Sequence, residues 1–202
     1  YGLRQAPSQA ARWRRNTAKS DNIGFRLQGR LQDDTGAWQV GADGFDSSHD
    51  SDIDNPNNPM FFVTNFNSAE REVLGLFIER QHNLGDRWQG ELGFRYNRVN
   101  MDAGKVDGTP AQMMMPAQML RDNFNSAQRD QTDDNIDLVA KDWFESSENS
   151  SWYLGLARKN RSPSYQERYL WLPLEATGGL ADGNTYTGNI KLRPETSNQV
   201  EF

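Results

Sequence analysis

Apolar and polar residues alternate along several stretches of about ten residues each. In residues 22–32 one phase is apolar and contains Ile23, Phe25, Leu27 and Leu31. A period of two places successive side chains on opposite faces of a strand, so each stretch predicts a β-strand with one apolar face and one polar face. The pattern predicts seven strands, at about residues 22–32, 37–43, 71–82, 88–97, 133–145, 151–161 and 196–202.

Short and long joints alternate between these strands. The short joints are residues 33–36, 83–86 and 146–149, and the long ones are about residues 46–70, 102–132 and 162–191. Tight turns at one rim and long loops at the other are typical of outer-membrane β-barrels, whose short turns are periplasmic. We therefore predict an all-β, antiparallel transmembrane β-barrel segment with extracellular long loops. The rival fold is a soluble secreted β-sandwich that acts as a binding module.

The pattern assigns the two faces more clearly in some strands than in others. In residues 88–97, Glu91 and Arg95 share the polar phase, and charges facing lipid at the midplane cost about 2–4 kcal/mol, less for Glu, so we expect both inside. Trp88, beside a short joint, fits an aromatic girdle. Residues 71–82 are apolar on both faces, which leaves their lipid side open. Seven strands in an open sheet would leave unpaired edges in hydrocarbon, so we expect the chain to continue on both sides.

Composition narrows the classes of function. Hydrophobic residues make up 35% of the 202, and no apolar run reaches the roughly 18 residues of a membrane-spanning helix. The absence of Cys excludes disulfides and thiolate metal sites, and a net charge of -6 argues against a nucleic-acid partner. With two His and no recognisable catalytic constellation, the sequence predicts neither an enzyme nor a bound cofactor.

Two stretches near the end of the sequence form an ordered pair. Residues 161–169 read R-x-P-S-x-x-E-R-Y, and residues 188–197 read G-N-x-x-L-x-P-E-x-S. In this order and within this strand rhythm, they resemble the paired signature of TonB-dependent outer-membrane receptors. Residues 75–79, followed by a short turn and residues 87–96, are similar to another hairpin of that family. Pro163 and Pro194 fit strand ends, because proline donates no N–H and keeps its predecessor extended.

The resemblance implies a function for a larger protein. Residues 1–202 would supply about seven strands of a barrel of about 22 strands. The plug domain, the TonB-interacting segment and the remaining strands would lie outside them. Such a receptor imports a ferric siderophore or a related metal complex across the outer membrane of a Gram-negative bacterium with TonB energy. The alternatives are a copper receptor of the same family, and a porin or surface binding module that does not use TonB.

The implied partners are TonB, the metal complex, outer-membrane lipid and lipopolysaccharide. A basic cluster near the start of the sequence has two interpretations, a surface-exposed strand end or a contact with anionic lipopolysaccharide. Its members are Arg12, Arg14 and Arg15, which surround Trp13.

The third long loop contains the aromatic candidates for ligand binding. Aromatic walls with nearby arginines would hold an anionic, aromatic iron chelate through stacking and cation–π contacts. The alternative is that the same groups lock the loop onto its neighbours. The candidates are Arg161, Tyr165, Arg168, Tyr169, Trp171 and Tyr186.

The other two long loops contain candidate metal ligands. Thioether sulfur suits Cu(I), whereas Met also serves as adaptable packing. We favour an iron chelate over copper, because packing accounts for the methionines and iron complexes are the commonest cargo that the resemblance implies. The acidic loop has the spacing of a calcium loop, but Asn55 and Phe61 stand where an EF-hand needs Gly and Glu, which leaves weak divalent binding or a solvated loop. The candidates are Met113, Met114, Met115 and Met119 in one loop, and His49, Asp50, Asp52 and Asp54 in the other.

Overall fold

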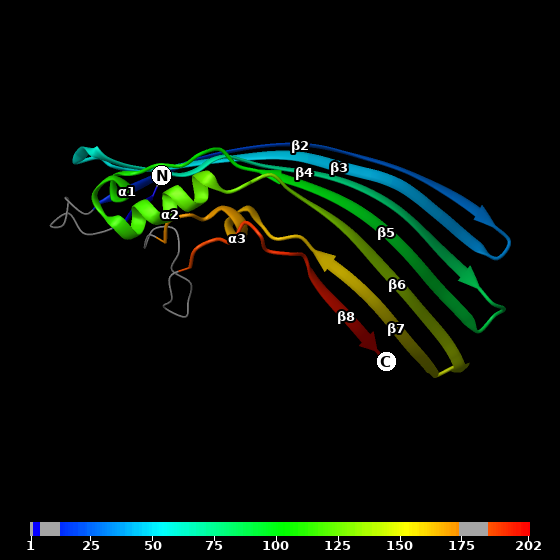
Figure 1. The fold of residues 1–202 in the computed structure, drawn as a ribbon. Coiled ribbons are helices and arrows are strands. Elements are labelled where there is room, and N and C mark those ends of the chain that lie inside the picture. Colours follow the sequence, from blue (N-terminus) through cyan, green and yellow to red (C-terminus); the bar gives the residue numbers. More distant parts are fainter. Residues whose placement is uncertain (1, 5–12, 174–185) are drawn as a thin grey trace.

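The computed structural model describes residues 2–4, 13–173 and 186–202, which form one curved antiparallel sheet with short helices against one end (Figure 1). The strands follow chain order across the sheet: β1 (Gly2–Arg4), β2 (Arg14–Asp33), β3 (Gly36–Asn55), β4 (Asn58–Asn83), β5 (Trp88–Asp102), β6 (Gln131–Ser147), β7 (Ser150–Arg161) and β8 (Glu195–Glu201). The helices are α1 (Thr109–Met113), α2 (Met115–Ser126) and α3 (Tyr165–Tyr169). The seven predicted strands correspond to β2 through β8, and β1 is an additional short strand on β2.

The three predicted short joints are confirmed, and all of them lie at the same end of the sheet, opposite the helices (Figure 1). The turn between β2 and β3 is held by its own side chains. Asp33 Oδ1 accepts a hydrogen bond from the backbone N–H of Thr35 at 2.9 Å, and Arg80 donates to both oxygens of that carboxylate. Gly36 has a φ of +149°, and a Cβ there would collide with the carbonyl of Gln81. Glycine is therefore required where this turn meets β4.

The first long joint is not a loop, so this part of the prediction is wrong. β3 continues to Asn55 and β4 begins at Asn58, and the two strands remain paired across residues 46–55, with register shifts near His49 and Asp54. The sequence pattern conceals this extension, because its outer positions, such as Asp46 and Asp52, are polar. Apolar and polar residues alternate clearly only where one face meets an apolar medium.

One face of the sheet exposes apolar side chains over its middle. Cross-strand register aligns them, for example Val40 with Ile78 and Ile78 with Phe94. This outer face contains the expected apolar phases and carries Ile23, Phe25, Leu27, Leu31, Trp38, Val40, Leu74, Leu76, Ile78, Trp88, Leu92, Phe94, Ile136, Leu138, Trp152, Leu154 and Leu156. A β-sandwich would bury such a face against a second sheet, and no second sheet is present among the described residues.

The structure also assigns the outer face of β4, which the sequence left open. Leu74, Leu76 and Ile78 are exposed on the outer face, whereas Phe77 is buried on the inner face. The Phe77 ring lies between two inner-face cations, with the Arg26 guanidinium 5.4 Å and the Arg95 guanidinium 5.8 Å from its centroid. Both phases are apolar here because an inward phenyl ring packs against arginine, and cations are attracted to aromatic faces.

The outer apolar band shifts along the strands in the way that tilted strands require. It begins at Ile23 on β2, but on β7 it begins at Leu156, whose register across the sheet leads back to Leu31. The shift from 23 to 31 is eight residues, or about 27 Å along a strand, over five strand steps, or about 24 Å across the sheet. The resulting tilt of roughly 45–50° is close to that of membrane β-barrels. None of the helices among the described residues is long and apolar enough to span a membrane.

Candidate functional site

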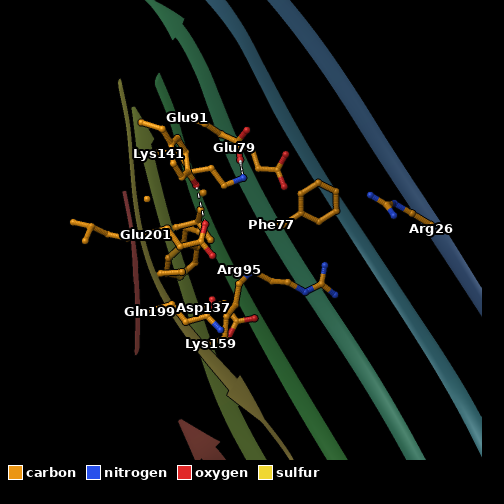
Figure 2. A pocket seen from close by; sticks show the side chains of 17 residues that line it. Arg26, Phe77, Glu79, Glu91, Arg95, Asp137, Lys141, Lys159, Gln199 and Glu201 are labelled. Carbon is orange, nitrogen blue, oxygen red and sulfur yellow. Dashed lines mark hydrogen bonds and ion pairs between the residues drawn. The ribbon is translucent and has the colours of Figure 1, made fainter. Parts of the chain in front are cut away.

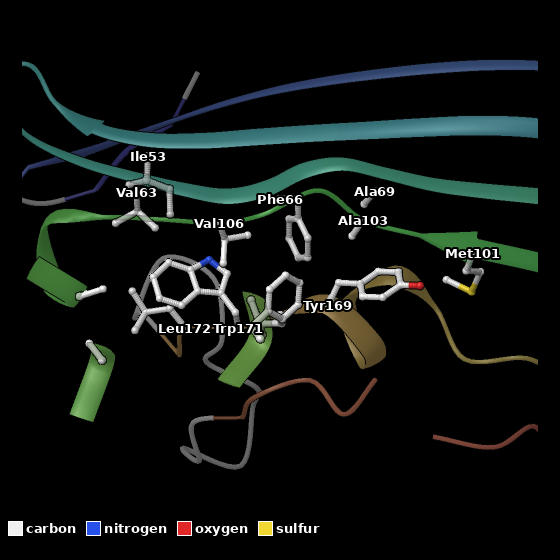
Figure 3. Close-up of a cluster of buried hydrophobic side chains, with 14 of the residues drawn as sticks. Ile53, Val63, Phe66, Ala69, Met101, Ala103, Val106, Tyr169, Trp171 and Leu172 are labelled. Carbon is white, nitrogen blue, oxygen red and sulfur yellow. The ribbon is translucent and has the colours of Figure 1, made fainter. Parts of the chain in front are cut away.

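The helices cover the inner, concave face of the sheet at the end away from the short turns (Figures 1 and 3). Ile53, Val63 and Phe66 point from β3 and β4 into a buried cluster that also contains Tyr169 and Trp171. We call this layer of helices and connecting segments, residues 103–130 and 162–192, the loop layer. Its described part packs over the inner face at what would be the mouth of a barrel.

Nearer the short turns, the inner face is polar (Figure 2). A hollow of about 320 Å³ is bordered there by side chains from β2 and from β4 through β8. Lys141 Nζ donates to Glu91 at 3.0 Å, and Arg95 Nη1 donates to Asp43 at 2.9 Å. The inward placement predicted for Glu91 and Arg95 is therefore confirmed. Charged pairs at this depth are compatible with a wet interior.

The structure places three of the aromatic and basic candidates inside the loop layer. Arg168, Tyr169 and Trp171 are 1%, 1% and 3% exposed. Arg168 pairs with Asp133, the Tyr169 hydroxyl donates to the carbonyl of Arg129, and Trp171 Nε1 donates to the carbonyl of Thr64. These contacts support the alternative interpretation, in which the groups lock the loop onto its neighbours. They do not form a ligand-facing wall in this structure.

The other three candidates of that loop are more accessible, and each has different contacts. Arg161 donates to both oxygens of Glu167 and also to Glu195. Tyr165 is half-buried and its ring stacks on His49, with centroids 4.6 Å apart. Tyr186 is 43% exposed. Residues 174–185, which include much of the same predicted loop, lie outside the described residues.

The two halves of the sequence signature form one structural unit. Ser164 and Glu167 make a capping box at the start of α3. Gly188 and Asn189 dock on this helix through their backbone N–H groups, which donate to the carbonyls of Leu170 and Glu167 at 2.6 and 2.8 Å. A Cβ at Gly188 would lie 2.6 Å from the carbonyl oxygen of Arg168, so this close approach requires glycine. We call residues 161–169 together with 188–195 the α3 clasp.

Packing of the loop layer on the sheet shifts the pKa values of several side chains. The Arg161 guanidinium lowers the pKa of Glu167 to about 2, with further help from the Ser164 N–H. Burial lowers the pKa of His49 on β3, whose ring contacts those of Phe66 and Tyr165. Burial also raises the pKa of Tyr169. At neutral pH we therefore expect Glu167 charged and His49 and Tyr169 neutral.

The second long loop forms helices that pack against the sheet, as the packing alternative expected, but its methionine side chains are exposed. Met113, Met114, Met115 and Met119 are 79%, 54%, 74% and 59% exposed. Their helices pack against the sheet through other residues, chiefly Ala111, Ala117 and Phe124. The long side chains of Met point away from the sheet because the smaller Ala residues occupy the close contacts.

A fifth exposed methionine was missed in the sequence. Met60, at the tip of the β3–β4 hairpin, is 81% exposed. The Thr109 hydroxyl donates to the Met60 carbonyl at 2.9 Å and accepts from the Phe62 N–H at 3.0 Å, which ties this tip to the start of α1. No sequence signal predicts this proximity, because residues 60 and 109 are joined only by the fold. We call Met60, Met113, Met114, Met115 and Met119 the methionine surface.

The acidic candidates do not form a metal site in this structure. Asp50, Asp52 and Asp54 lie on strand β3, which spreads the first and the last of them about 14 Å apart, so the three carboxylates do not converge on one ion. Asp50 accepts from the Ser68 N–H at 2.7 Å, and Asp54 pairs with Arg15. Over the described part of the chain, no group of three or more His, Cys, Asp and Glu side chains is arranged to hold a metal ion. The divalent-ion alternative assumed a loop that can curl around an ion, whereas these residues lie on a strand.

The basic cluster has partners within the protein where it is described. Besides the pairing of Arg15 with Asp54, the Arg14 guanidinium lies 3.7 Å from the centroid of the Phe61 ring. Arg12 lies outside the described residues. These contacts favour the interpretation as a strand end.

Comparison with known families gives one result. The sequence model described as "TonB dependent receptor-like, beta-barrel" matches residues 2–202. No match was found among curated proteins or among solved structures.

Proposed function

The chain belongs to the TonB-dependent receptor β-barrel family, and from this premise we propose that it forms part of a receptor that imports copper. Membership places it in the outer membrane of a Gram-negative bacterium, as a receptor for a transported ligand with TonB as its partner. In the proposal the outer apolar face meets lipid, residues 1–202 are part of a larger barrel, and the chain itself catalyses no reaction.

The methionine surface is the observation that supports copper as the cargo. It contains five of the six methionines of the chain, four on the loop layer and Met60 near the tip of the β3–β4 hairpin, and all five are exposed in this structure. Because these side chains are exposed, packing within residues 1–202 does not account for methionine at these positions. Thioether sulfur is a soft ligand that selects Cu(I) over hard ions such as Mg²⁺ and Ca²⁺. Several exposed thioethers at the mouth of an importer are suited to capturing a soft cation.

The preference for an iron chelate that we drew from the sequence had two grounds, the commonest cargo of the family and packing as the reason for the methionines. The second ground is weakened, because four of these side chains are exposed in this structure. The aromatic wall that was to hold such a chelate also loses Arg168, Tyr169 and Trp171, which are buried. A ferric siderophore stays a prediction without a structural argument in the described residues. It is therefore the competing outcome in the test of the proposal.

The test replaces Met113, Met114, Met115 and Met119 together by Leu in the full-length product of the gene. Leu keeps the volume and apolarity of Met and removes the sulfur, so each substitution should reduce the stability of the fold by less than about 1.5 kcal/mol. We expect accumulation of copper under copper limitation to fall at least tenfold, with barrel assembly in the outer membrane unchanged. Growth on ferric chelates under iron limitation should not change.

The matched control is Gln118→Leu, which adds apolar surface on α2 and leaves every sulfur in place. It should accumulate copper like the wild type. If the quadruple variant accumulates copper normally, the methionine surface does not bind the cargo. If deletion of the gene abolishes growth on a ferric chelate and leaves copper accumulation unchanged, the cargo is iron.

A further inference from the structure

A continuous series of contacts links the barrel wall to the helix that carries two of the exposed methionines. It begins at Asp133 on β6, passes through Arg168 and Tyr169 of the α3 clasp, and ends at the C-terminus of α2. Figure 3 shows Tyr169 lying inside the loop layer between the sheet and the helices.

The first contact is a buried ion pair. Arg168 Nη2 lies 2.8 Å from both carboxylate oxygens of Asp133, and the two side chains are 1% and 7% exposed. The same nitrogen donates to the Leu192 carbonyl at 2.9 Å, while Arg168 Nε is buried without a hydrogen-bond partner among the described residues. Desolvation of a buried pair can cancel its attraction, so such pairs are poor sources of stability. The pair instead fixes the orientation of α3 relative to β6.

The second contact joins α3 to α2. The Tyr169 hydroxyl donates to the carbonyl of Arg129 at 2.9 Å, and the Tyr169 ring meets Phe124 of α2 edge-on, with centroids 6.4 Å apart. Arg129 Nη1 in turn donates to the carbonyls of Phe124, Asn125 and Ala127, and its Nε donates to Ala103. The carbonyls at a helix C-terminus have no partners within the helix, so this guanidinium both ends α2 and anchors it.

We propose that Arg168 is a positioning residue for the methionine surface. It touches none of the exposed methionines, and it acts through Tyr169 and Arg129, which hold α2 at a fixed place relative to the barrel wall. Side chains that bind a ligand as a set must be held to within about 0.5 Å, so if Met115 and Met119 on α2 take part in binding, a loosened α2 binds the ligand less tightly. The identity of the ligand rests on the proposed function, whereas the placement of α2 by Arg168 does not.

The experiment uses the full-length product with Arg168→Lys, which keeps the charge but loses the planar group that reaches both Asp133 and Leu192. Cysteines introduced at Gln118 on α2 and Glu70 on β4, both exposed, carry spin labels; the present chain has no Cys of its own. We expect the distance distribution between the labels to broaden. In copper uptake, the half-saturating concentration should rise about tenfold, the loss expected for one charge-assisted hydrogen bond, and the maximal rate should stay near that of the wild type.

Arg80→Lys is the matched control. Arg80 also makes two hydrogen bonds to one carboxylate, that of Asp33, but at the short turns. It should change neither the label distance nor the half-saturating concentration. Asp133→Asn serves as a second variant if Arg168→Lys does not assemble, because Asn keeps the shape and one acceptor of Asp and should broaden the distance in the same way.

An unchanged distance distribution in the variant that assembles would overturn the proposal. A broadened distribution with unchanged half-saturation would overturn it too, because Arg168 would then stabilise the loop layer without placing its ligand groups. If the wild type takes up no copper, the proposed function fails, and the label distance alone decides whether Arg168 positions α2.

Discussion

The indole ring of Trp88 packs against the ring of Phe144 on the neighbouring strand, with centroids 4.6 Å apart. Trp152 follows in register on β7, so three aromatic side chains form a row across β5, β6 and β7 beside the short turns. Aromatic rings of this kind mark the interface of membrane β-barrels. The row places the short turns at one membrane boundary, with the exposed apolar band beginning directly beyond it.

A lysine on the outer face should prevent assembly far more than one on the inner face. Leu138 lies in the apolar band, in register with Phe94, whereas its neighbour Val139 lines the polar hollow. Leu138→Lys should destabilise the folded barrel by about 2–4 kcal/mol, because the charge faces hydrocarbon. Val139→Lys is the control and should assemble. Folding titrations in urea with lipid vesicles measure both, and equal losses would refute our assignment of the faces.

Gly36→Ala should destabilise the barrel at the turn between β2 and β3. Its φ of +149° is strained for Ala by about 1–3 kcal/mol, and the Cβ would also meet the backbone of Gln81. Gly29→Ala on the preceding strand is the control, because a Cβ there has open space. Thermal unfolding in detergent should separate the two variants, and a normal Gly36→Ala protein would show that the turn is not tight in solution.

The two ends of the sheet should lie on opposite sides of the outer membrane. Asn57 is exposed at the tip of the β3–β4 hairpin, and Glu148 is exposed in the short turn between β6 and β7. In intact cells, a membrane-impermeant thiol reagent should label Asn57→Cys and leave Glu148→Cys unlabelled until the cells are broken. The reverse pattern would invert the topology.

Acid should loosen the α3 clasp. Because Arg161 lowers the pKa of Glu167 from 4.5 to about 2, the folded state favours the charged carboxylate. Its contribution to stability is present above pH 4.5 and is lost as the pH falls toward about 2. Hydrogen exchange of the α3 amides, corrected for intrinsic rates, should show the loss of protection. Glu167→Gln should be less protected at neutral pH and should show a weaker pH dependence in this window.

The sequence by itself determined the middle of the sheet and its short turns, but not the extension of β3 and β4 beyond the apolar band. The period of two fixed which residues of β5 face out, and the paired joints fixed which strand ends lie together, because both are local consequences of strand geometry. The signature of residues 161–169 and 188–197 fixed the family for the same kind of reason. Its Gly188 and its capping residues Ser164 and Glu167 are the ones whose contacts build the α3 clasp in this chain.

Only the tertiary structure decided which side chains are available to a ligand. Arg168, Tyr169 and Trp171 look in the sequence like a binding wall, and the fold buries them, because the loop layer turns inward onto the barrel wall. Met113 and Met115 look like packing residues and are exposed, because Ala117 and Phe124 take the contacts with the sheet. Burial depends on which distant segments meet, and neither periodicity nor spacing within one loop contains that information.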